Sequence, residues 1–352
     1  MRAIEAILDA ARWAPSGDNT QTWQFDILAD DRVRIHGFDT RDWCVYDLDG
    51  HASQLALGAL LETLRIAASA HGLRAEWTRR AATADNHLMI DVVLTPDPGL
   101  GADERRPYIE SRSVQRRAMG SAALSAAEKA ELEAAAVPCR VIWFEALPAR
   151  ASIARLNFDS AEIRLTIPEA YRTHSTIIEW GARFSEDRIP EVAVGVDPAT
   201  ARLMRFVLAS WRRVEFFNRW LMGTLVPRLQ LDLIPGLACS GHAYLVMPSP
   251  PVTVDDYVAA GQCMQRFWLT VEKLGMQSQP EMTPLIFARY VRENRPFTDL
   301  PAGRQGAAGI ADRLAALLGP EALARATWAC RIGRRRALPG RSLRKPLSAL
   351  LR

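Results

Sequence analysis

Side chains that could bind an anion are concentrated in two short segments far apart in the sequence. Residues 112–117 hold three arginines and a serine, and residues 341–347 hold two arginines, a lysine and a serine. Guanidinium groups bind phosphate through paired, charge-assisted hydrogen bonds, so each segment could hold a phosphate dianion. Because a charge run is more often a solvated surface, the two segments indicate a site only if they meet in space.

A loop of neutral polar residues follows the first predicted helix. Pro15 to Gln21 combines Ser, Asn, Thr and Gln side chains with a glycine, directly before a predicted strand. Such a loop offers hydrogen-bond donors and acceptors to the edge of a planar heterocycle. The alternative is an ordinary turn that ends a helix, and general turn chemistry favours it.

Other catalytic patterns are missing. The five cysteines contain no Cys-x-x-Cys pair and the six histidines are scattered, so we expect reduced, mostly buried thiols and no metal site. No Gly-x-Ser-x-Gly and no Gly-x-Gly-x-x-Gly occurs. The sequence therefore predicts neither a serine hydrolase nor a resident Rossmann nicotinamide site.

Hydrophobic periodicity predicts the elements that position these residues. A helix from Ile4 to Trp13 ends at Pro15, and a capping box of Ser125 and Glu128 opens a helix through Ala136. Residues 152–218 are helix-rich, and residues 96–107 are the best linker. Further helices are predicted at 55–71 and 254–274, and strands at 23–28, 32–37, 88–95, 141–144, 243–247 and 327–332.

Composition fits a globular protein with about two domains. The chain has 352 residues, 49% apolar and 24% charged, and no apolar run approaches the length of a membrane span. The start of the chain lacks the features of a secretion signal, so we expect a cytoplasmic protein. The net charge of +4 conceals a basic tail, residues 331–352, with eight Lys or Arg and no acid.

The chain carries signs of an internal duplication. Gly58 and Gly72 are fourteen residues apart, as are Gly261 and Gly275, at an offset of 203. Leu8-Asp9-Ala10-Ala11 also matches Leu132-Glu133-Ala134-Ala135. The polar loop belongs only to the first copy and the arginine segment at 112–117 only to the second, so each half lacks what the other keeps.

Four segments resemble the FMN-dependent nitroreductase superfamily. The family's flavin-ring loop resembles Ala14-Pro15-Ser16-Gly17-x-Asn19-x-Gln21-x-Trp23, although Thr22 stands where the family usually has proline. Its phosphate segment resembles residues 112–117, and its two carboxy-terminal flavin elements resemble residues 275–280 and 341–347. In that family two identical subunits interlock and each FMN lies at their interface.

The resemblance implies an α+β fold, an α/β sandwich of two nitroreductase-like halves. Each half is expected to be a mostly antiparallel sheet flanked by helices, and the two pack as an intrachain pseudo-dimer like the tandem proteins of the Acg branch. Residues 1–105 form the half with the flavin-ring loop. Residues 106–352 form the half with the phosphate-binding segments and a helical insertion at about 152–236.

The resemblance also implies one FMN per chain and an oxidoreductase that moves hydride between flavin N5 and NAD(P)H or a small organic substrate. No catalytic side chain is assigned. We expect a monomeric pseudo-dimer, with further homodimerisation open, and no nucleic-acid or membrane partner. The implied cofactor-binding residues are Pro15, Ser16, Gly17, Asn19, Gln21, Arg112, Ser113, Gln115, Arg116, Gln277, Ser278, Arg341 and Arg344.

Three alternatives stay open. The insertion could cover the flavin, which would make the chain an FMN-binding or FMN-sequestering protein with little or no turnover. The basic tail could bind nucleic acid or a membrane, with strong salt dependence. Within the insertion, Tyr171 and His174 could contact substrate, but helix-surface packing is favoured. The aromatic residues Trp211, Phe216, Phe217 and Trp220 are expected to be core or interface.

Overall fold

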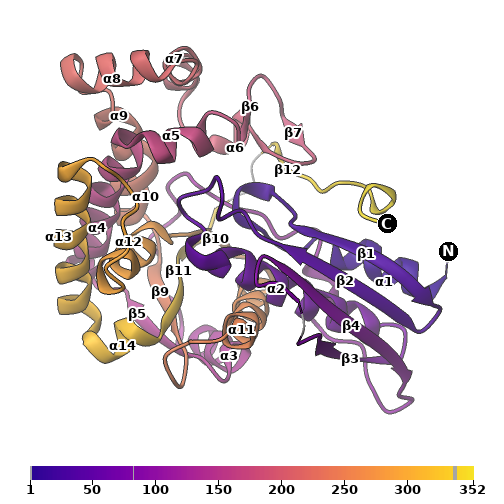
Figure 1. The fold of residues 1–352 in the computed structure, drawn as a ribbon. Coiled ribbons are helices and arrows are strands. Elements are labelled where there is room, and N and C mark those ends of the chain that lie inside the picture. Colours follow the sequence, from indigo (N-terminus) through magenta and orange to yellow (C-terminus); the bar gives the residue numbers. More distant parts are fainter. Residues whose placement is uncertain (1, 82, 336–338) are drawn as a thin grey trace.

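The first half of the chain folds into one antiparallel sheet covered by helices (Figure 1). The computed structural model describes residues 2–81, 83–335 and 339–352. Strands pair in the order β1-β2-β4-β3, and every neighbouring pair is antiparallel. The elements are α1 (Ala3–Ala11), β1 (Trp23–Ala29), β2 (Arg32–Phe38), α2 (His51–Ser69), β3 (Leu73–Arg79) and β4 (His87–Pro96).

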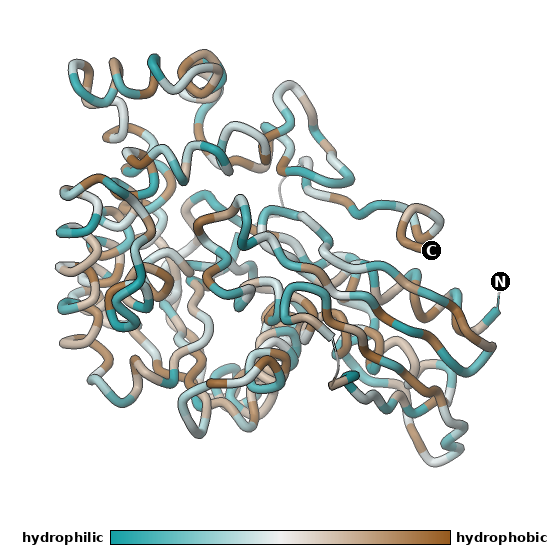
Figure 2. Tube along the Cα trace, viewed as in Figure 1, coloured by the Kyte–Doolittle hydropathy of each residue, from teal (hydrophilic) through white to brown (hydrophobic). Residues whose placement is uncertain are grey.

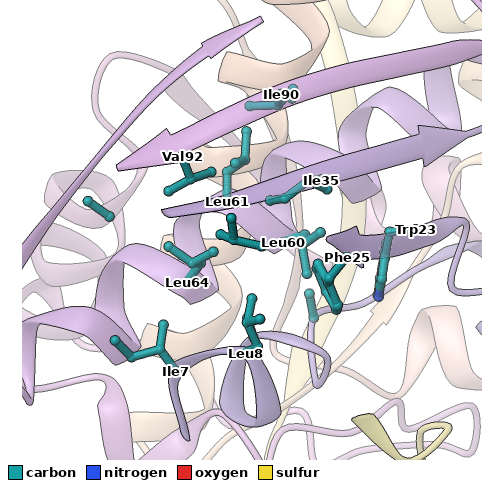
Figure 3. Packing of buried hydrophobic residues seen from close by; sticks show 14 of the residues in the cluster. Ile7, Leu8, Trp23, Phe25, Ile35, Leu60, Leu61, Leu64, Ile90 and Val92 are labelled. Atoms are coloured by element: carbon teal, nitrogen blue, oxygen red, sulfur yellow. The ribbon is translucent and has the colours of Figure 1, made fainter. Parts of the chain in front are cut away.

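Alternation along the strands builds the core of this half. Phe25, Ile35 and Ile90 are buried on one face of the sheet, where they meet apolar residues of α1 and α2 such as Leu8 and Leu60 (Figure 3). Successive strand side chains point to opposite faces, so alternate residues reach the helices. This packing fixes the position of the polar loop, which runs directly from α1 into β1.

The second half repeats the order of elements and the order of strands. Its sheet is β5-β9-β11-β10, again with every neighbouring pair antiparallel. The predicted α+β class, with antiparallel sheets flanked by helices, is therefore confirmed. The elements are α3 (Ala126–Ala136), β5 (Arg140–Phe144), β9 (Gly241–Val246), α11 (Val254–Lys273), β10 (Gln277–Pro280) and β11 (Ala326–Gly333).

Two helical excursions interrupt the second half. The expected insertion lies between β5 and β9: α4 (Leu147–Thr166), α5 (Pro168–His174), β6 (Ile178–Glu179), β7 (Phe184–Ser185), β8 (Ile189–Pro190), α6 (Glu191–Val194), α7 (Pro198–Leu208), α8 (Trp211–Trp220), α9 (Leu225–Arg228) and α10 (Ile234–Leu237). The second excursion lies between β10 and β11 and was not predicted. It consists of α12 (Thr283–Arg292), α13 (Pro301–Leu318) and α14 (Pro320–Arg325). The helices α4 and α7–α10 of the first excursion and all of the second lie on the side of the molecule away from the first sheet, whereas β6–β8 lie over the first half (Figure 1).

The long helices α2 and α11 cross at a pair of glycines. A Cβ on Gly58 would lie 2.0 Å from the Val258 carbonyl oxygen, and a Cβ on Gly261 would lie 2.0 Å from the Leu55 carbonyl oxygen. Leu55 and Val258 are themselves separated by the offset of 203, so the contact is self-complementary, as across a twofold axis. Only glycine allows the two backbones to approach this closely.

The C-terminal segment returns to the first half. β12 (Arg341–Ser342) pairs with β7, and after it Leu350 accepts a hydrogen bond from Phe25 N at 2.8 Å while Arg352 N donates to the Phe25 carbonyl at 3.0 Å. Leu350 is buried in the first core. The end of the basic tail is therefore packed against β1, the strand that follows the polar loop. Arg336 of the tail lies outside the described residues.

Candidate functional site

The loop after α1 is held in an unusual backbone conformation. Asp18, Asn19 and Gln21 all have positive φ, which is uncommon for residues other than glycine. Ser16 Oγ accepts a hydrogen bond from Gln21 N at 3.0 Å, and Thr20 Oγ1 donates to the Gly17 carbonyl at 2.9 Å. These local bonds keep the loop folded back on itself, so its side chains face the second half.

Two buried arginines and one half-buried arginine surround the start of this loop. Arg112 donates to the Trp13 carbonyl at 3.0 Å, Arg344 donates to the Ala14 carbonyl at 3.0 Å, and Arg341 stacks over the Trp13 ring with 5.1 Å to its centroid. Arg112 and Arg344 are each less than 10% exposed. We call Arg112, Arg341 and Arg344 the arginine cluster. Residues from both ends of the second half thus meet the first half at one point.

The arginine cluster is only partly compensated by negative charge: the Glu272 carboxylate opposes the lowering of the pKa of Arg112 and of Arg341. Within residues 2–81, 83–335 and 339–352, none of its three guanidiniums forms an ion pair with a carboxylate. Burial lowers the pKa of Arg112 to about 10, and burial followed by the charges of Arg112 and Arg341 lowers the pKa of Arg344 well below its ordinary value. Burying like charges without a direct ion pair is costly, so an anion at the cluster would be stabilising.

A cavity of about 800 Å³ lies beside the loop. Pro15, Ser16, Gly17 and Asp18 form part of its wall, together with Arg116 and apolar residues of the insertion. The arginine cluster does not itself line the cavity. The cluster and the cavity meet at Trp268, which lines the cavity while the Arg112 guanidinium lies 4.5 Å from its ring centroid.

The remaining predicted site residues connect the loop, the cluster and the insertion. Asn19 Nδ2 donates to the Glu186 and Arg188 carbonyls at 3.2 and 3.3 Å, whereas its buried Oδ1 lacks a partner in the described chain. Gln21 donates to the Glu186 carbonyl at 2.8 Å and accepts from Lys345 N at 2.9 Å. The amide side chains of the loop are thus covered by the segment between β7 and β8.

The segment around residue 113 is anchored to β10. Gln115 N donates to the Ser278 carbonyl at 2.9 Å, and Ser113 Oγ donates to Gln277 Oε1 at 3.4 Å. Arg116 points elsewhere: its guanidinium donates to the Ala193 carbonyl at 2.9 Å and lines the cavity. The predicted residues therefore divide into a cavity set (Pro15, Ser16, Gly17, Arg116), the arginine cluster, and a connecting set (Asn19, Gln21, Ser113, Gln115, Gln277, Ser278).

The cavity wall includes charged and polar residues that the sequence analysis missed. Asp18 was passed over inside the loop; burial raises its pKa, and Arg116 opposes that effect. Arg164 pairs with Asp232 at 3.1 Å. His174, for which helix-surface packing was favoured, packs against Tyr46, with its Nε2 3.1 Å from the Tyr46 hydroxyl, and it also lines the cavity. Helical spacing alone does not distinguish a cavity wall from a packed surface.

A chain of buried, hydrogen-bonded charged residues supports another part of the cavity wall, where Glu281 and Arg331 line it. Arg331 donates to Glu281 Oε1 at 3.0 Å, and Glu281 Oε2 lies 2.6 Å from His242 Nδ1. Although burial opposes it, the Glu281 carboxylate raises the pKa of His242 to about 10. His242 is therefore a cation at neutral pH and completes a compensated network, whereas the arginine cluster is only partly compensated.

Stability is expected to fall at alkaline pH because of His242. Its folded pKa of about 10 lies above the ordinary value of 6.5, so its contribution is complete below about pH 6.5 and is lost as the pH rises toward 10. Urea unfolding across this range should show a loss of roughly 1 kcal/mol per pH unit. His242→Asn should remove the decline, and His71→Asn, at an exposed position, should keep it. A wild-type protein with constant stability over this range would contradict the assignment.

Comparison with known proteins gives one family match. Residues 2–159 match the Nitroreductase family. This matched segment contains both the polar loop and the arginines at 112–117, and it spans less than half of the chain. A nitroreductase-like family protein from Bacillus cereus is 12% identical, with a TM-score of 0.33 over 70% of this chain and 94% of that chain. No curated protein matches the sequence.

The described part of the chain contains no group of three or more His, Cys, Asp or Glu side chains placed to hold a metal ion. Among residues 2–81, 83–335 and 339–352, every helix is too short or too polar to span a bilayer. The five cysteines are free and buried, as expected.

Proposed function

We propose that this chain is an FMN-dependent oxidoreductase that moves hydride between NAD(P)H or a small organic substrate and the flavin. The observation that carries the proposal is the largely buried arginine cluster, which forms no ion pair in the described chain and is placed against the loop that precedes β1. The phosphate of FMN is an anion of suitable charge for such a cluster. The nitroreductase match at residues 2–159 supports flavin-dependent oxidoreduction as the chemistry.

The residues divide the work of holding FMN. Bound FMN would supply a ring that accepts and donates hydride. Arg112 and Arg344 would hold the phosphate, because their guanidiniums are buried and directed by the Trp13 and Ala14 carbonyls. Ser16 and Gly17 would face the ring, because both line the cavity. The largely apolar remainder of the cavity would exclude bulk water and admit the second substrate.

We also propose that the two halves are copies of one unit, as in tandem nitroreductase-like proteins of the Acg branch. The identical strand order and the self-complementary crossing at Gly58 and Gly261 support this. The equivalent of the polar loop in the second half is reduced to Val137-Pro138, which leads into β5. The chain then keeps one flavin site and has lost the other.

One FMN per chain is the expected stoichiometry. Denaturing the purified holoprotein and measuring the released flavin against protein concentration tests it. A ratio near one supports a single site built from the two halves. A ratio near two would contradict the loss of the second site, and the absence of flavin after reconstitution with FMN would contradict the proposed function.

The second candidate is an FMN-binding protein with little turnover. The carbonyls of Glu186 and Arg188 already occupy the Asn19 and Gln21 amides, so the insertion covers part of the flavin loop. Steady-state oxidation of NAD(P)H with a nitroaromatic or a quinone separates the two candidates. Consumption of NAD(P)H favours the oxidoreductase, whereas reduction by light alone favours the binding protein.

A further inference from the structure

Helices α7 and α8 project from the body of the molecule (Figure 1). They expose a concentration of large apolar side chains. Phe206, Phe216 and Trp220 are 51%, 55% and 66% exposed. The expectation that Phe216 and Trp220 are core or interface residues is therefore wrong for the isolated chain. We call residues 198–226 the cap; its exposed apolar residues are Leu203, Phe206, Phe216, Trp220, Leu221, Met222 and Val226.

The same two helices are strongly basic. Between residues 198 and 222 the sequence has five arginines and a single acidic residue, Glu215. In the described chain none of these arginines forms an ion pair; Arg213 lies over the Phe206 ring at 4.2 Å and Arg219 over the Trp220 ring at 5.2 Å. Figure 2 shows hydrophilic and hydrophobic residues interleaved along both helices. The five arginines of these two helices are Arg202, Arg205, Arg212, Arg213 and Arg219.

We propose that the cap docks on an anionic phospholipid surface. Helices that bind at the membrane interface combine exposed aromatic residues with arginines and few acids, because the rings enter the headgroup region while the guanidiniums contact lipid phosphates. Arg212, Phe216, Arg219 and Trp220 share one exposed face of α8. A second copy of this chain is a poor occupant, because the same five arginines would face each other.

The cap also lines the cavity from its inner side. Met204, Val207 and Phe217 contribute to the cavity wall, and Leu221 and Met222 lie both at the wall and at the exposed surface. The Phe217 ring contacts the exposed rings of Phe206 and Phe216, with centroids 6.4 and 6.0 Å apart. Docking therefore brings lipid next to the cavity, so a largely apolar substrate can enter from the bilayer; this last step rests on the proposed function.

Vesicle sedimentation of the holoprotein tests the docking. We expect binding to phosphatidylcholine vesicles that contain phosphatidylglycerol, weakened at high salt, and little binding to phosphatidylcholine alone. Phe216→Ser with Trp220→Ser should reduce the partition coefficient at least tenfold, and Arg212→Gln with Arg219→Gln about 30-fold. The matched control, Leu28→Ser with Trp43→Ser, removes two exposed apolar residues of the first half and should bind like the wild type.

Three results would overturn the proposal: no sedimentation with either vesicle, equal sedimentation with both, or equal loss in the cap and control variants. Sedimentation velocity without lipid completes the test, because self-association that depends on Phe216 and Trp220 would instead identify a second copy as the occupant. Flavin content and circular dichroism of each variant show whether the fold is retained. The docking does not depend on turnover, so Arg344→Met should lose FMN and still bind the vesicles, which separates failure of this inference from failure of the proposed function.

Discussion

Replacing Arg344 with methionine should weaken FMN binding roughly ten- to hundredfold and leave the flavin-free protein as stable as the wild type or more stable. Hydrogen bonds to a charged group contribute about 1.5–3 kcal/mol, and all of that is lost when the guanidinium is absent. Without FMN, however, the buried Arg344 faces Arg112 and Arg341 as like charges. Methionine keeps much of the volume and removes the repulsion, so affinity and stability should move in opposite directions.

Fluorescence titration of apoprotein with FMN measures the affinity, and thermal unfolding without FMN measures the stability. Arg79→Met is the matched control, because Arg79 also makes two hydrogen bonds between distant segments, to the Asp255 carboxylate, but lies on β3 away from the loop. It should keep FMN at wild-type affinity. Equal affinity of wild type and Arg344→Met, or equal loss in the control, would remove the basis for a phosphate at the arginine cluster.

Gly261→Ala should lower the free energy of unfolding by about 3 kcal/mol or more. Its Cβ would lie 2.0 Å from the Leu55 carbonyl oxygen and 2.9 Å from Leu55 Cα. These are backbone atoms of α2, so the overlap is relieved only by separating the two central helices. Overpacking of a rigid contact usually costs about 1–3 kcal/mol, and a backbone clash lies at or beyond the upper end.

Urea unfolding provides the measurement, with Gly309→Ala as the control. Gly309 lies within α13 with open space around its missing Cβ, so alanine there should stabilise by about 0.5–1 kcal/mol. Gly58→Ala should resemble Gly261→Ala, because the crossing is self-complementary. Gly58→Ala combined with Gly261→Ala should lower the free energy of unfolding by less than the sum of the two single effects, since the first substitution already separates the helices. A neutral Gly261→Ala would mean that the two helices do not cross as described.

Local chemistry made many elements predictable from the sequence. The capping box at Ser125 and Glu128 is present, and α3 follows it to Ala136. Gly72 and Gly275, expected to end the long helices, have φ of +64° and +69°, a conformation that glycine adopts without strain. The edge strand β3 was not predicted, although exposed Arg74, Glu76 and Thr78 alternate in it with the less exposed Leu73, Ala75 and Trp77.

The sequence by itself determined which residues are candidates for flavin binding, because side-chain type and loop motif are local properties. Only the tertiary structure decided that Arg112 and Arg344, 232 positions apart, lie against the Trp13 and Ala14 carbonyls, and that Arg116 turns toward the cavity instead. It also decided that Phe216 and Trp220 are exposed while His174 lines a cavity. An amphipathic pattern specifies which residues share a face, but burial of that face depends on which distant segment covers it.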